Sequence, residues 1–359
     1  MKVSDFSFDL PSELIAQRPA EPRDSARLLV YDRATDTIEH RLVRDLPDLL
    51  PPASTIVANN SKVRHSRLWG LTERGKQIEL FVLAPEASTY HCLLGGSGVR
   101  AYAGSISLFA DAARSQRINM TAEVVASISG PGMQTYSVQF NGTDDVEAEL
   151  ERYAELPLPP YISGRTSANE QYQTVFAKEL GSAAAPTAGL HFTPELIARL
   201  IDRGMTWNEI TLHVGLGTFL PLRNEEIDAN RLHSERCHVC QSVADAVNGP
   251  CMTLAIGTTT ARTLESHCLH GTVRTGWEET EIFIRPGYTF KAVDCLLTNF
   301  HLPKSSLLLL VAAFIGNTPR TEQLSMSAEE MRWRLLRIYN EAITRRYRFF
   351  SFGDAMLLL

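Results

Sequence analysis

Three histidines lie in short segments rich in glycine or proline, where a side chain can reach a ligand. His191 lies in APTAGLHFT, His213 in TLHVGLGTF and His301 in TNFHLPKS. Imidazole titrates near neutral pH, so histidines that enter neighbouring loops can act as an acid and a base. A single histidine is more often structural, so the interpretation depends on all three. Together they indicate an enzyme.

Charged residues near these histidines could complete such a site. Glu235 follows His233 in LHSE, and a carboxylate beside an imidazole shifts the base toward neutral pH. The alternative is a cluster that caps a helix start. Lys304 follows His301 across a rigid proline, so both could face one anionic or leaving group. The alternative there is a surface lysine beside a histidine bonded to the backbone.

The segment GTTTAR, residues 257–262, is predicted to join a strand to a helix. Its unpaired helix N–H groups, threonine hydroxyls and Arg262 suit a carboxylate or a phosphate. Threonines that only cap the helix explain the same pattern equally well. The segment therefore needs support from elsewhere in the chain.

A strip of basic and aromatic residues follows the last predicted helix. Arg345, Arg346 and Arg348 alternate there with Tyr347 and two phenylalanines. Such a strip can hold phosphates and stack on bases. Arginines also gather at helix C-termini because of the helix dipole.

Cys237 and Cys240 have the two-residue spacing of a zinc site, with His233 and His238 nearby. No second cysteine pair at ligand spacing follows, so no metal is expected. The six cysteines stand at irregular positions, which is typical of reduced thiols.

Composition limits the class of protein. With 359 residues, 44% of them hydrophobic and 21% charged, the chain can form two domains with separate cores. The acidic N-terminal segment does not resemble a signal peptide, and the longest apolar run is about half of what a bilayer requires, so a cytoplasmic protein with no membrane contact is expected. A net charge of −6 argues against general coating of nucleic acid, yet allows a local basic strip.

Hydrophobic periodicity predicts a mixed α/β fold with an insertion. Residues 76–140 alternate between short strands and tight turns, which indicates a small all-β unit. The predicted larger domain comprises residues 1–70 and 151–359, and the inserted domain residues 71–150. A helix is predicted from Pro194, capped by Thr193 and stopped by Gly204, and a strand over residues 210–214 places His213 on one face.

An ordered series of motifs resembles one known family. The motifs are MKVSDFSFDLPSELIAQRP, RDSARLLV, LPLPPYI, YQTVFA, APTAGLHFT, TLHVGLGTF, HSE, GTT with RTLES, IFIRPGY, TNFHLPKS and YRFFSFGDAML. In this order they resemble the S-adenosylmethionine:tRNA ribosyltransferase-isomerase family of queuosine biosynthesis. The resemblance covers nearly the whole chain.

The resemblance implies an activity and a fold. The family transfers and isomerises the ribosyl portion of S-adenosylmethionine onto the 7-aminomethyl-7-deazaguanine wobble base of tRNA, giving epoxyqueuosine and releasing adenine and methionine. S-adenosylmethionine is thus a ribosyl-donor substrate, and no metal is implied. The implied fold is a larger α/β domain with a barrel-like sheet and a smaller inserted β-barrel domain, here expected as a monomer.

The implied chemistry assigns residues on the matching motifs as a hypothesis. The catalytic set is His191, His213, Glu235, His301, Lys304 and Asp354. The S-adenosylmethionine-binding set is Gly189, Gly215, Gly217, Thr218, Gly257, Thr258, Thr259, Arg262 and Asn299. The tRNA-binding set is Lys62, Arg67, Arg345, Arg346 and Arg348.

Two segments depart from the family pattern. NNSKVRHSRL, residues 59–68, stands where a stretch resembling NDTKVIPARL is usual, and LGGSGVRAYAG, residues 94–104, replaces a turn rich in lysine and proline. Both concern tRNA docking or substrate choice. The alternatives are a paralogue that modifies another deazapurine, in nucleic acid or a free nucleotide, and a catalytically silent RNA-binding relative.

Overall fold

The computed structural model describes residues 1–96, 102–129, 134–159, 161–162, 171–215, 222–316 and 326–359. The chain divides into two compact units. The large unit comprises Met1–Lys62, Pro159–Glu179 and Ala185–Leu359, and the small unit comprises Val63–Leu158 and Leu180–Ala184. The predicted limits of the two domains, at residues 70/71 and 150/151, stay a prediction.

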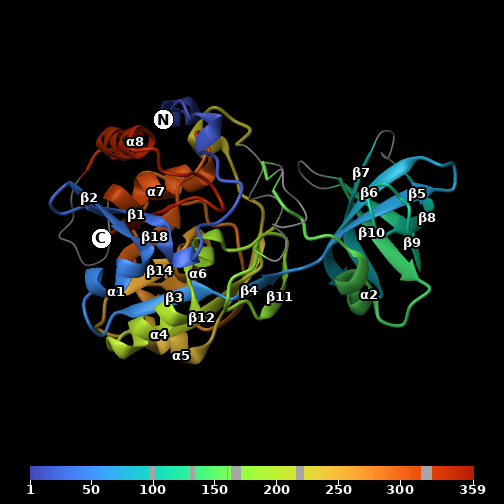
Figure 1. Cartoon of the computed structure of the whole chain (residues 1–359), viewed down its shortest axis with the longest axis horizontal. Coiled ribbons are helices and arrows are strands. Elements are labelled where there is room, and N and C mark those ends of the chain that lie inside the picture. Colours follow the sequence, from blue (N-terminus) through green and yellow to red (C-terminus); the bar gives the residue numbers. More distant parts are fainter. Residues whose placement is uncertain (97–101, 130–133, 160, 163–170, 216–221, 317–325) are drawn as a thin grey trace. The chain divides into compact units, whose positions relative to one another are not determined.

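The large unit is built on a nine-stranded sheet (Figure 1). Its order is β17 (Gly276–Thr280), β13 (Glu235–Val239), β12 (Thr206–Leu212), β3 (Thr55–Asn59), β14 (Thr253–Ile256), β18 (Cys295–Asn299), β19 (Ala355–Leu358), β1 (Arg27–Asp32) and β2 (Thr37–Leu42). The central strands β12, β3, β14 and β18 run parallel. Such strands are covered on both faces and read as continuous apolar runs, as the fully buried β3, β14 and β18 do. Where a barrel-like sheet was expected, the described strands form an open sheet with β17 and β2 at its edges.

Helices and short elements of the large unit complete its layers. The helices are α1 (Leu46–Leu49), α4 (Pro194–Asp202), α5 (Gln241–Val247), α6 (Thr258–His267), α7 (Ser306–Gly316) and α8 (Ala328–Thr344). Single-turn 3₁₀ helices are η1 (Val3–Phe6), η2 (Ser12–Leu14), η3 (Arg23–Ser25), η4 (Val43–Asp45), η5 (Thr187–His191) and η7 (Ile227–Ala229). The short strands are β15 (Cys268–Leu269) and β16 (Thr272–Val273), with β4 (Ser61–Val63) and β11 (Glu179–Ser182) at the limits of the units.

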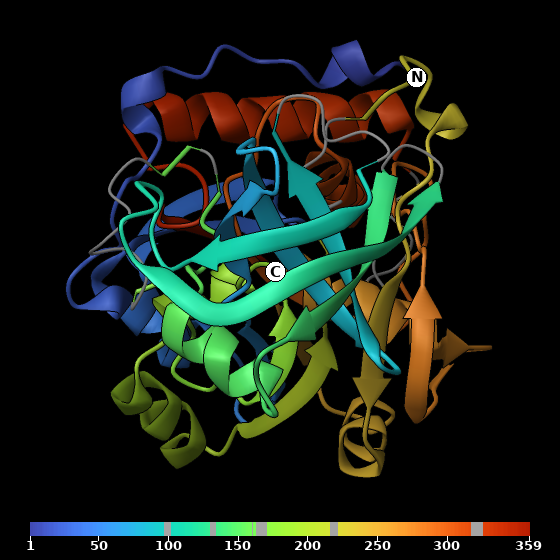
Figure 2. The ribbon, with the colours of Figure 1, turned by 90° about the vertical axis from the view of Figure 1, so that its right-hand side faces the viewer.

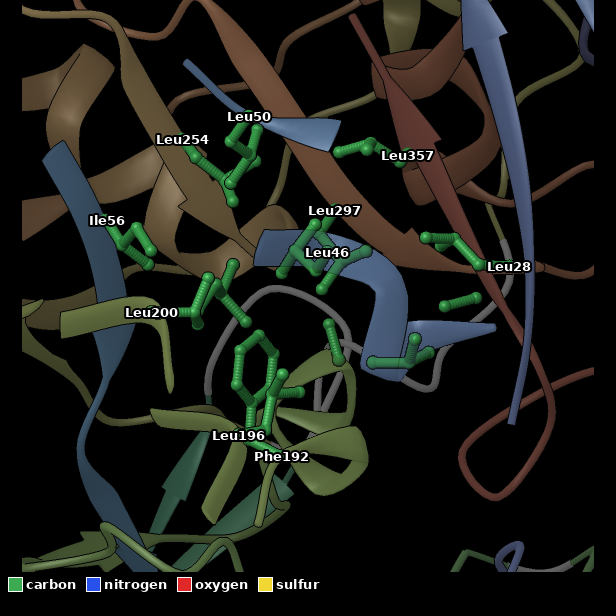
Figure 3. Packing of buried hydrophobic residues seen from close by; sticks show 14 of the residues in the cluster. Leu28, Leu46, Leu50, Ile56, Phe192, Leu196, Leu200, Leu254, Leu297 and Leu357 are labelled. Carbon is green, nitrogen blue, oxygen red and sulfur yellow. The ribbon is translucent and has the colours of Figure 1, made fainter. Parts of the chain in front are cut away.

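Local sequence signals explain helix α4. Thr193 accepts a hydrogen bond from the backbone N–H of Leu196 at 3.2 Å, and Pro194 occupies the first helical position. Gly204 follows the helix with φ of 86°, a conformation that favours glycine. The predicted start and stop of this helix are confirmed. Leu196 and Leu200 project into a cluster on one face of the sheet (Figure 3).

That cluster is the main core on one face of the sheet. Ile56, Leu254 and Leu297 from three neighbouring strands pack there with Phe192 of the segment after η5 (Figure 3). Burial of such side chains stabilises by about 1.5–3 kcal/mol each. The core therefore fixes η5 and α4 against the ends of β3, β14 and β18.

The small unit contains six antiparallel strands and a helix (Figure 2). The strands are β5 (Arg67–Thr72), β6 (Gln77–Glu86), β7 (Thr89–Gly95), β8 (Gly104–Phe109), β9 (Arg117–Ser129) and β10 (Gln134–Asn141), closing in the order β10-β7-β6-β5-β8-β9, with α2 (Val146–Tyr153) after them. Gly70, where the sequence suggested a domain limit, lies inside β5. A Cβ there would lie 2.5 Å from the Ile106 side chain, so this glycine permits close packing inside the strand.

The predicted mixed α/β class is confirmed, with a large sheet and a six-stranded antiparallel sheet. Helix α8 begins after Ser327, whose hydroxyl accepts a hydrogen bond from the N–H of Glu330 at 3.2 Å. In the part of the chain that the structure describes, no helix has the length and apolar character to cross a bilayer.

Candidate functional site

Four parallel strands of the large unit end at one edge of the sheet, and most predicted site residues follow those ends. β3 ends at Asn59, β12 at Leu212, β14 at Ile256 and β18 at Asn299. The chain passes from β3 to β12 on one side and later to β14 on the other. In open α/β sheets, ligands bind outside the carboxyl ends of strands at such a switch point. This edge is the candidate site.

Asn59 connects three of these strand ends. Its Nδ2 donates to the carbonyl of Leu212 at 3.0 Å and to Oγ1 of Thr259 at 3.4 Å, while its Oδ1 accepts from the Leu212 N–H at 3.0 Å. Asn59 is not among the residues predicted from the sequence. A buried apolar strand that ends in an amide, TIVAN, was the available signal.

Asn299 lies at the neighbouring end and holds the segment that carries His191. Its Oδ1 accepts from Oγ1 of Thr187 at 3.0 Å, and its Nδ2 donates to the carbonyl of Phe350 at 3.1 Å. Thr187 was also missed as a single residue, although its motif was identified. This network positions backbone at the strand ends.

Two glycines of the predicted ligand-binding set have packing reasons for their identity. Gly257 begins α6 with φ of 88°, which lets the chain turn from strand to helix. A Cβ on Gly189 would lie 2.7 Å from Cζ of Phe176 and 2.9 Å from Cγ2 of Thr174. Gly189 therefore accommodates an aromatic ring of the core. Thr258 is buried in the first turn of α6, and Gly217 and Thr218 lie outside the described residues.

His191 is enclosed by backbone. Its Nδ1 lies 3.0 Å from the carbonyl of Ala188 and its Nε2 lies 3.1 Å from the carbonyl of Gly353. Burial lowers the pKa of His191, although both carbonyls oppose that shift. A neutral imidazole has only one N–H, so it cannot donate to both carbonyls at once. His191 links η5 to the segment before β19.

His213 has the same intermediate exposure as His301, and its Nδ1 is buried, whereas His191 is buried as a whole. His213 follows β12, is partly exposed, and stacks on Trp277 with ring centroids 5.9 Å apart and an interplanar angle of 16°. The Arg236 guanidinium also lies over the Trp277 ring, 4.2 Å from its centroid. An imidazole in this setting can exchange protons with a ligand at the edge.

His301 follows β18 and has one sealed ring nitrogen. Its Nδ1 is buried and makes no hydrogen bond within the described residues, while Nε2 lies 3.5 Å from Oγ1 of Thr298. Loss of solvation lowers the pKa of His301 to about 3, so the ring is neutral at physiological pH. Lys304 is exposed and its backbone, with φ of 60°, donates to the carbonyl of Phe6 at 3.0 Å.

Both carboxylate oxygens of Asp354 accept hydrogen bonds from residues of the large unit. Its Oδ2 accepts from the backbone N–H of Arg348 at 2.8 Å. Its Oδ1 accepts from Nε and Nη2 of Arg348 at 3.2 and 3.0 Å and from the backbone N–H of Arg27 at 3.2 Å. Four donors hold this carboxylate, which ties the final loop to β1. Arg348, predicted to hold tRNA, is thus committed to Asp354.

Glu235 and Arg262 form the second buried ion pair at this edge. Nη1 of Arg262 donates to Oε2 of Glu235, and the backbone N–H of Gly215 donates to Oε1 at 3.0 Å. Nε of Arg262 donates to the carbonyl of Ile282 at 3.3 Å. Nη2 of Arg262 is buried without a hydrogen-bond partner in the described structure.

A pocket opens beside this pair. Its empty volume is about 360 Å³, counted out to its open mouth, and it is lined by Gly215, Leu232, His233, Glu235, Arg262, Ser306 and Leu307. The pocket thus lies between the segment that follows β12, helix α6 and the start of α7. Ser306 is not among the residues predicted from the sequence, where its place at a helix start was the available signal.

The sheet separates the predicted catalytic residues into two groups. Thr211 pairs with His238 and Leu212 with Cys237 across β12 and β13, so His213 belongs to the face of His238 and Glu235 to that of Cys237. Trp277 pairs with His238, in agreement with its stacking on His213. His213 and Glu235 therefore approach a common ligand only at the edge, from opposite faces.

The predicted tRNA-binding residues have different surroundings. Arg345 and Arg346 are exposed after α8, where Nε of Arg345 donates to Glu341. Lys62 is partly exposed at the end of the large unit. In the small unit, Arg67 is paired with Glu79 and lies 4.6 Å from the Trp69 ring centroid.

The cysteines of the zinc alternative have other contacts. Sγ of Cys237 lies 3.5 Å from the carbonyl of Glu278, and burial raises the pKa of this thiol to about 11. Sγ of Cys240 lies 3.3 Å from Oγ of Ser242. Across the described ranges, no group of three or more His, Cys, Asp or Glu residues is placed to hold a metal.

Comparison with known proteins identifies relatives along the whole chain. The family described as "Queuosine biosynthesis protein" matches residues 3–358. The S-adenosylmethionine:tRNA ribosyltransferase-isomerase of Symbiobacterium thermophilum is 45% identical over 100% of both chains, and that of Geobacter metallireducens is 43% identical with the same coverage.

A solved structure is similar in fold as well. The crystal structure of the S-adenosylmethionine tRNA ribosyltransferase from Thermotoga maritima is 32% identical, with a TM-score of 0.54 over 99% of this chain and 100% of that one.

Proposed function

Because the chain belongs to the queuosine biosynthesis protein family, we propose that it is a ribosyl-transferring enzyme that modifies tRNA. It transfers and isomerises the ribosyl portion of S-adenosylmethionine onto the 7-aminomethyl-7-deazaguanine wobble base of tRNA, and releases adenine and methionine. The observation that carries this proposal is the full-length similarity, at 45% identity, to a relative named for this reaction.

The reaction makes three demands on a protein. The sulfonium acidifies the neighbouring ribose C–H bonds, so a positioned base can begin the rearrangement by removing a proton. Adenine leaves more readily when a donor reaches its ring, and the attacking amine of the base must be neutral. All three are tasks for groups that are neutral or that exchange protons near pH 7.

Among the proposed catalytic residues, His213 is best placed to act as the base. His213 is partly exposed at the carboxyl edge, with its Nδ1 buried, whereas both nitrogens of the buried His191 face carbonyls. His301 has a sealed nitrogen and stays neutral, which suits a group that contacts a leaving base without charge. His191, Asn299 and Asp354 position the loops, and Lys304 supplies an exposed cation after His301.

The finer features of the proposal concern partners and organisation. The small unit acts as an inserted all-β barrel domain, and the exposed Arg345 and Arg346 contact tRNA phosphates. The enzyme works as a cytoplasmic monomer without a metal. The two unusual segments, residues 59–68 and 94–104, adjust how tRNA docks.

Adenine release tests the function directly. The protein is incubated with S-adenosylmethionine and a tRNA that carries the aminomethyl-deazaguanine base, adenine is followed by chromatography, and the tRNA is digested for mass spectrometry. Adenine release together with epoxyqueuosine supports the proposal. Another modified deazapurine supports the paralogue, and tRNA binding with no adenine release supports the silent binder; either result contradicts the proposal.

A further inference from the structure

We propose that the pocket beside Glu235 and Arg262 binds the α-amino-acid end of S-adenosylmethionine. The α-carboxylate faces Arg262 and the start of α7, and the α-ammonium faces Glu235. This inference rests on the proposed function, since it assigns one end of that substrate to one part of the site.

The first argument is the incomplete bonding of Arg262. The guanidinium side chain is 5% exposed, and two of its three nitrogens donate to Glu235 and to the carbonyl of Ile282. The third, Nη2, makes no hydrogen bond among the described residues although it is buried. A buried unsatisfied donor costs about 1–3 kcal/mol. A carboxylate oxygen in the pocket would satisfy it.

The second argument comes from the start of α7 on the pocket wall. Ser305 caps the helix: its hydroxyl accepts from the N–H of Leu308 at 3.2 Å, and its carbonyl accepts from the N–H of Leu309 at 3.3 Å. Within the described chain, the backbone N–H groups of Ser306 and Leu307 and the Ser306 hydroxyl make no hydrogen bond. Such donors at the positive end of a helix bind anions.

The third argument is charge balance. Glu235 and Arg262 together carry no net charge, and Glu235 places a carboxylate on the pocket wall. A phosphate dianion would be repelled by that carboxylate. An amino-acid zwitterion is neutral overall and offers an ammonium to Glu235 and a carboxylate to Arg262, so both of its charges meet opposite charges.

The fourth argument is the apolar part of the lining. Leu232 and Leu307 provide apolar surface beside the polar residues. The methylene groups and the sulfur substituents of the methionine portion would pack on these leucines. A donor for the carboxylate, an acceptor for the ammonium and an apolar wall together match this end of the substrate better than they match adenine.

Binding of three small molecules tests the assignment. Calorimetry compares L-methionine, 3-(methylthio)propylamine, which lacks the carboxylate, and 4-(methylthio)butanoate, which lacks the ammonium. We expect wild-type protein to bind methionine about 10-fold or more tightly than either analogue, a difference of about 1.4 kcal/mol or more. In Arg262→Lys, the remaining cation stays with Glu235, so the preference for methionine over the propylamine falls to about 3-fold or less.

Further variants keep the test valid if the ion pair is needed for folding. Ser306→Ala removes one pocket hydroxyl that makes no hydrogen bond within the described chain, and it should weaken methionine binding about 3- to 10-fold. Arg334→Gln is the matched control, because Arg334 is also a partly buried arginine in ion pairs, with Asp36 and Glu330. It should bind methionine as the wild type does.

The results separate this inference from the proposed function. Equal binding of methionine and the propylamine by wild type, no binding at ~10 mM methionine, or unchanged binding in both Arg262→Lys and Ser306→Ala overturns the assignment. If adenine release still occurs, the proposed function stands without it. Discrimination among the three probes without adenine release supports the pocket assignment and contradicts the function.

Discussion

Two arginine–carboxylate pairs in the large unit, each with a buried carboxylate, differ in how completely they are bonded. In the pair of Arg348 and Asp354, four donors from this chain occupy the carboxylate, and the arginine lies partly at the surface. In the pair of Arg262 and Glu235, both side chains are buried, yet Nη2 of Arg262 has no partner in the described chain. The pair of Arg348 and Asp354 holds the loop before β19 in place. The pair of Arg262 and Glu235 leaves one guanidinium nitrogen without a hydrogen bond beside the pocket.

The difference distinguishes structural burial of charge from burial that serves a ligand. When all hydrogen bonds of a buried ion pair are made within the protein, the pair holds in place the backbone segments that it connects. A buried pair with a donor left over costs free energy in the unliganded protein, and a ligand can recover it. Residue types do not distinguish the two cases, since both were predicted as functional from their motifs.

The largest effect is expected from Asp354→Ala. Removing the carboxylate leaves the Arg348 and Arg27 donors without their acceptor, and breaking a buried pair costs about 3–5 kcal/mol. Urea denaturation measures this loss in the free energy of unfolding. Asp354→Asn keeps an acceptor oxygen and should lose less. Equal stability of the alanine variant and the wild type would contradict a structural role.

The second-largest effect is a loss of catalytic activity, and it is expected from a substitution of Arg262. Arg262→Lys retains a cation for Glu235 and loses the second donor of the fork, so kcat/KM for adenine release should fall about 10- to 100-fold. The free energy of unfolding should change by about 1 kcal/mol or less, because no new charge is left unpaired. Arg334→Lys is the control. A loss of stability without loss of activity would make the two pairs equivalent.

The third effect tests whether Gly189 serves packing. Gly189→Ala places a Cβ against Phe176 and Thr174, and such overpacking costs about 1–3 kcal/mol. Thermal or urea unfolding measures the loss. Phe176→Leu removes the nearer atom, so the double variant should recover part of it; strictly additive losses would argue against this contact.

The fourth effect is a pH dependence of stability. The pKa of His301 is lowered from 6.5 to about 3 in the folded protein, so below pH 6.5 the unfolded chain binds a proton that the folded chain does not. Stability therefore falls as pH falls from about 6.5 toward about 3, by up to ~1.4 kcal/mol per pH unit for this histidine. His301→Gln should reduce this slope in urea denaturation at pH 7, 6 and 5. An unchanged slope would show that the ring is solvated.

The smallest effect on stability is expected at the surface. Arg345→Gln should change the free energy of unfolding by about 0.5 kcal/mol or less. It should reduce the slope of log tRNA affinity against log salt by about 1 if Arg345 contacts a phosphate. Arg203→Gln, an exposed arginine that pairs with Asp48, is the control. Identical salt slopes in the two variants would remove Arg345 from the tRNA-binding set.

Local signals in the sequence predicted local structure well. Thr193 and Pro194 define the start of α4, and Ser327 defines that of α8, because a cap and its partner are only three residues apart. The strand-to-helix turn at Gly257 was predicted for the same reason. These features depend on backbone conformation and need no knowledge of distant contacts.

The candidate site depends on distant contacts, which sequence patterns do not contain. Glu235 and Arg262 are 27 residues apart, and Asn59 meets Thr259 across 200 residues. The placement of His213 and Glu235 on opposite faces follows from the pairing of β12 with β13, not from either strand alone. At Gly189 the sequence alone does not separate close packing from close approach of a ligand, because both select glycine.

The unbonded nitrogen of Arg262 also bears on how long the protein survives in a cell. If a ligand removes the cost of about 1–3 kcal/mol, the fraction of opened molecules falls about 5- to 150-fold. Proteases act on that fraction, so the chain should be degraded more slowly when its ligand is abundant. The amount of enzyme would then follow the supply of its sulfonium substrate without any change in synthesis.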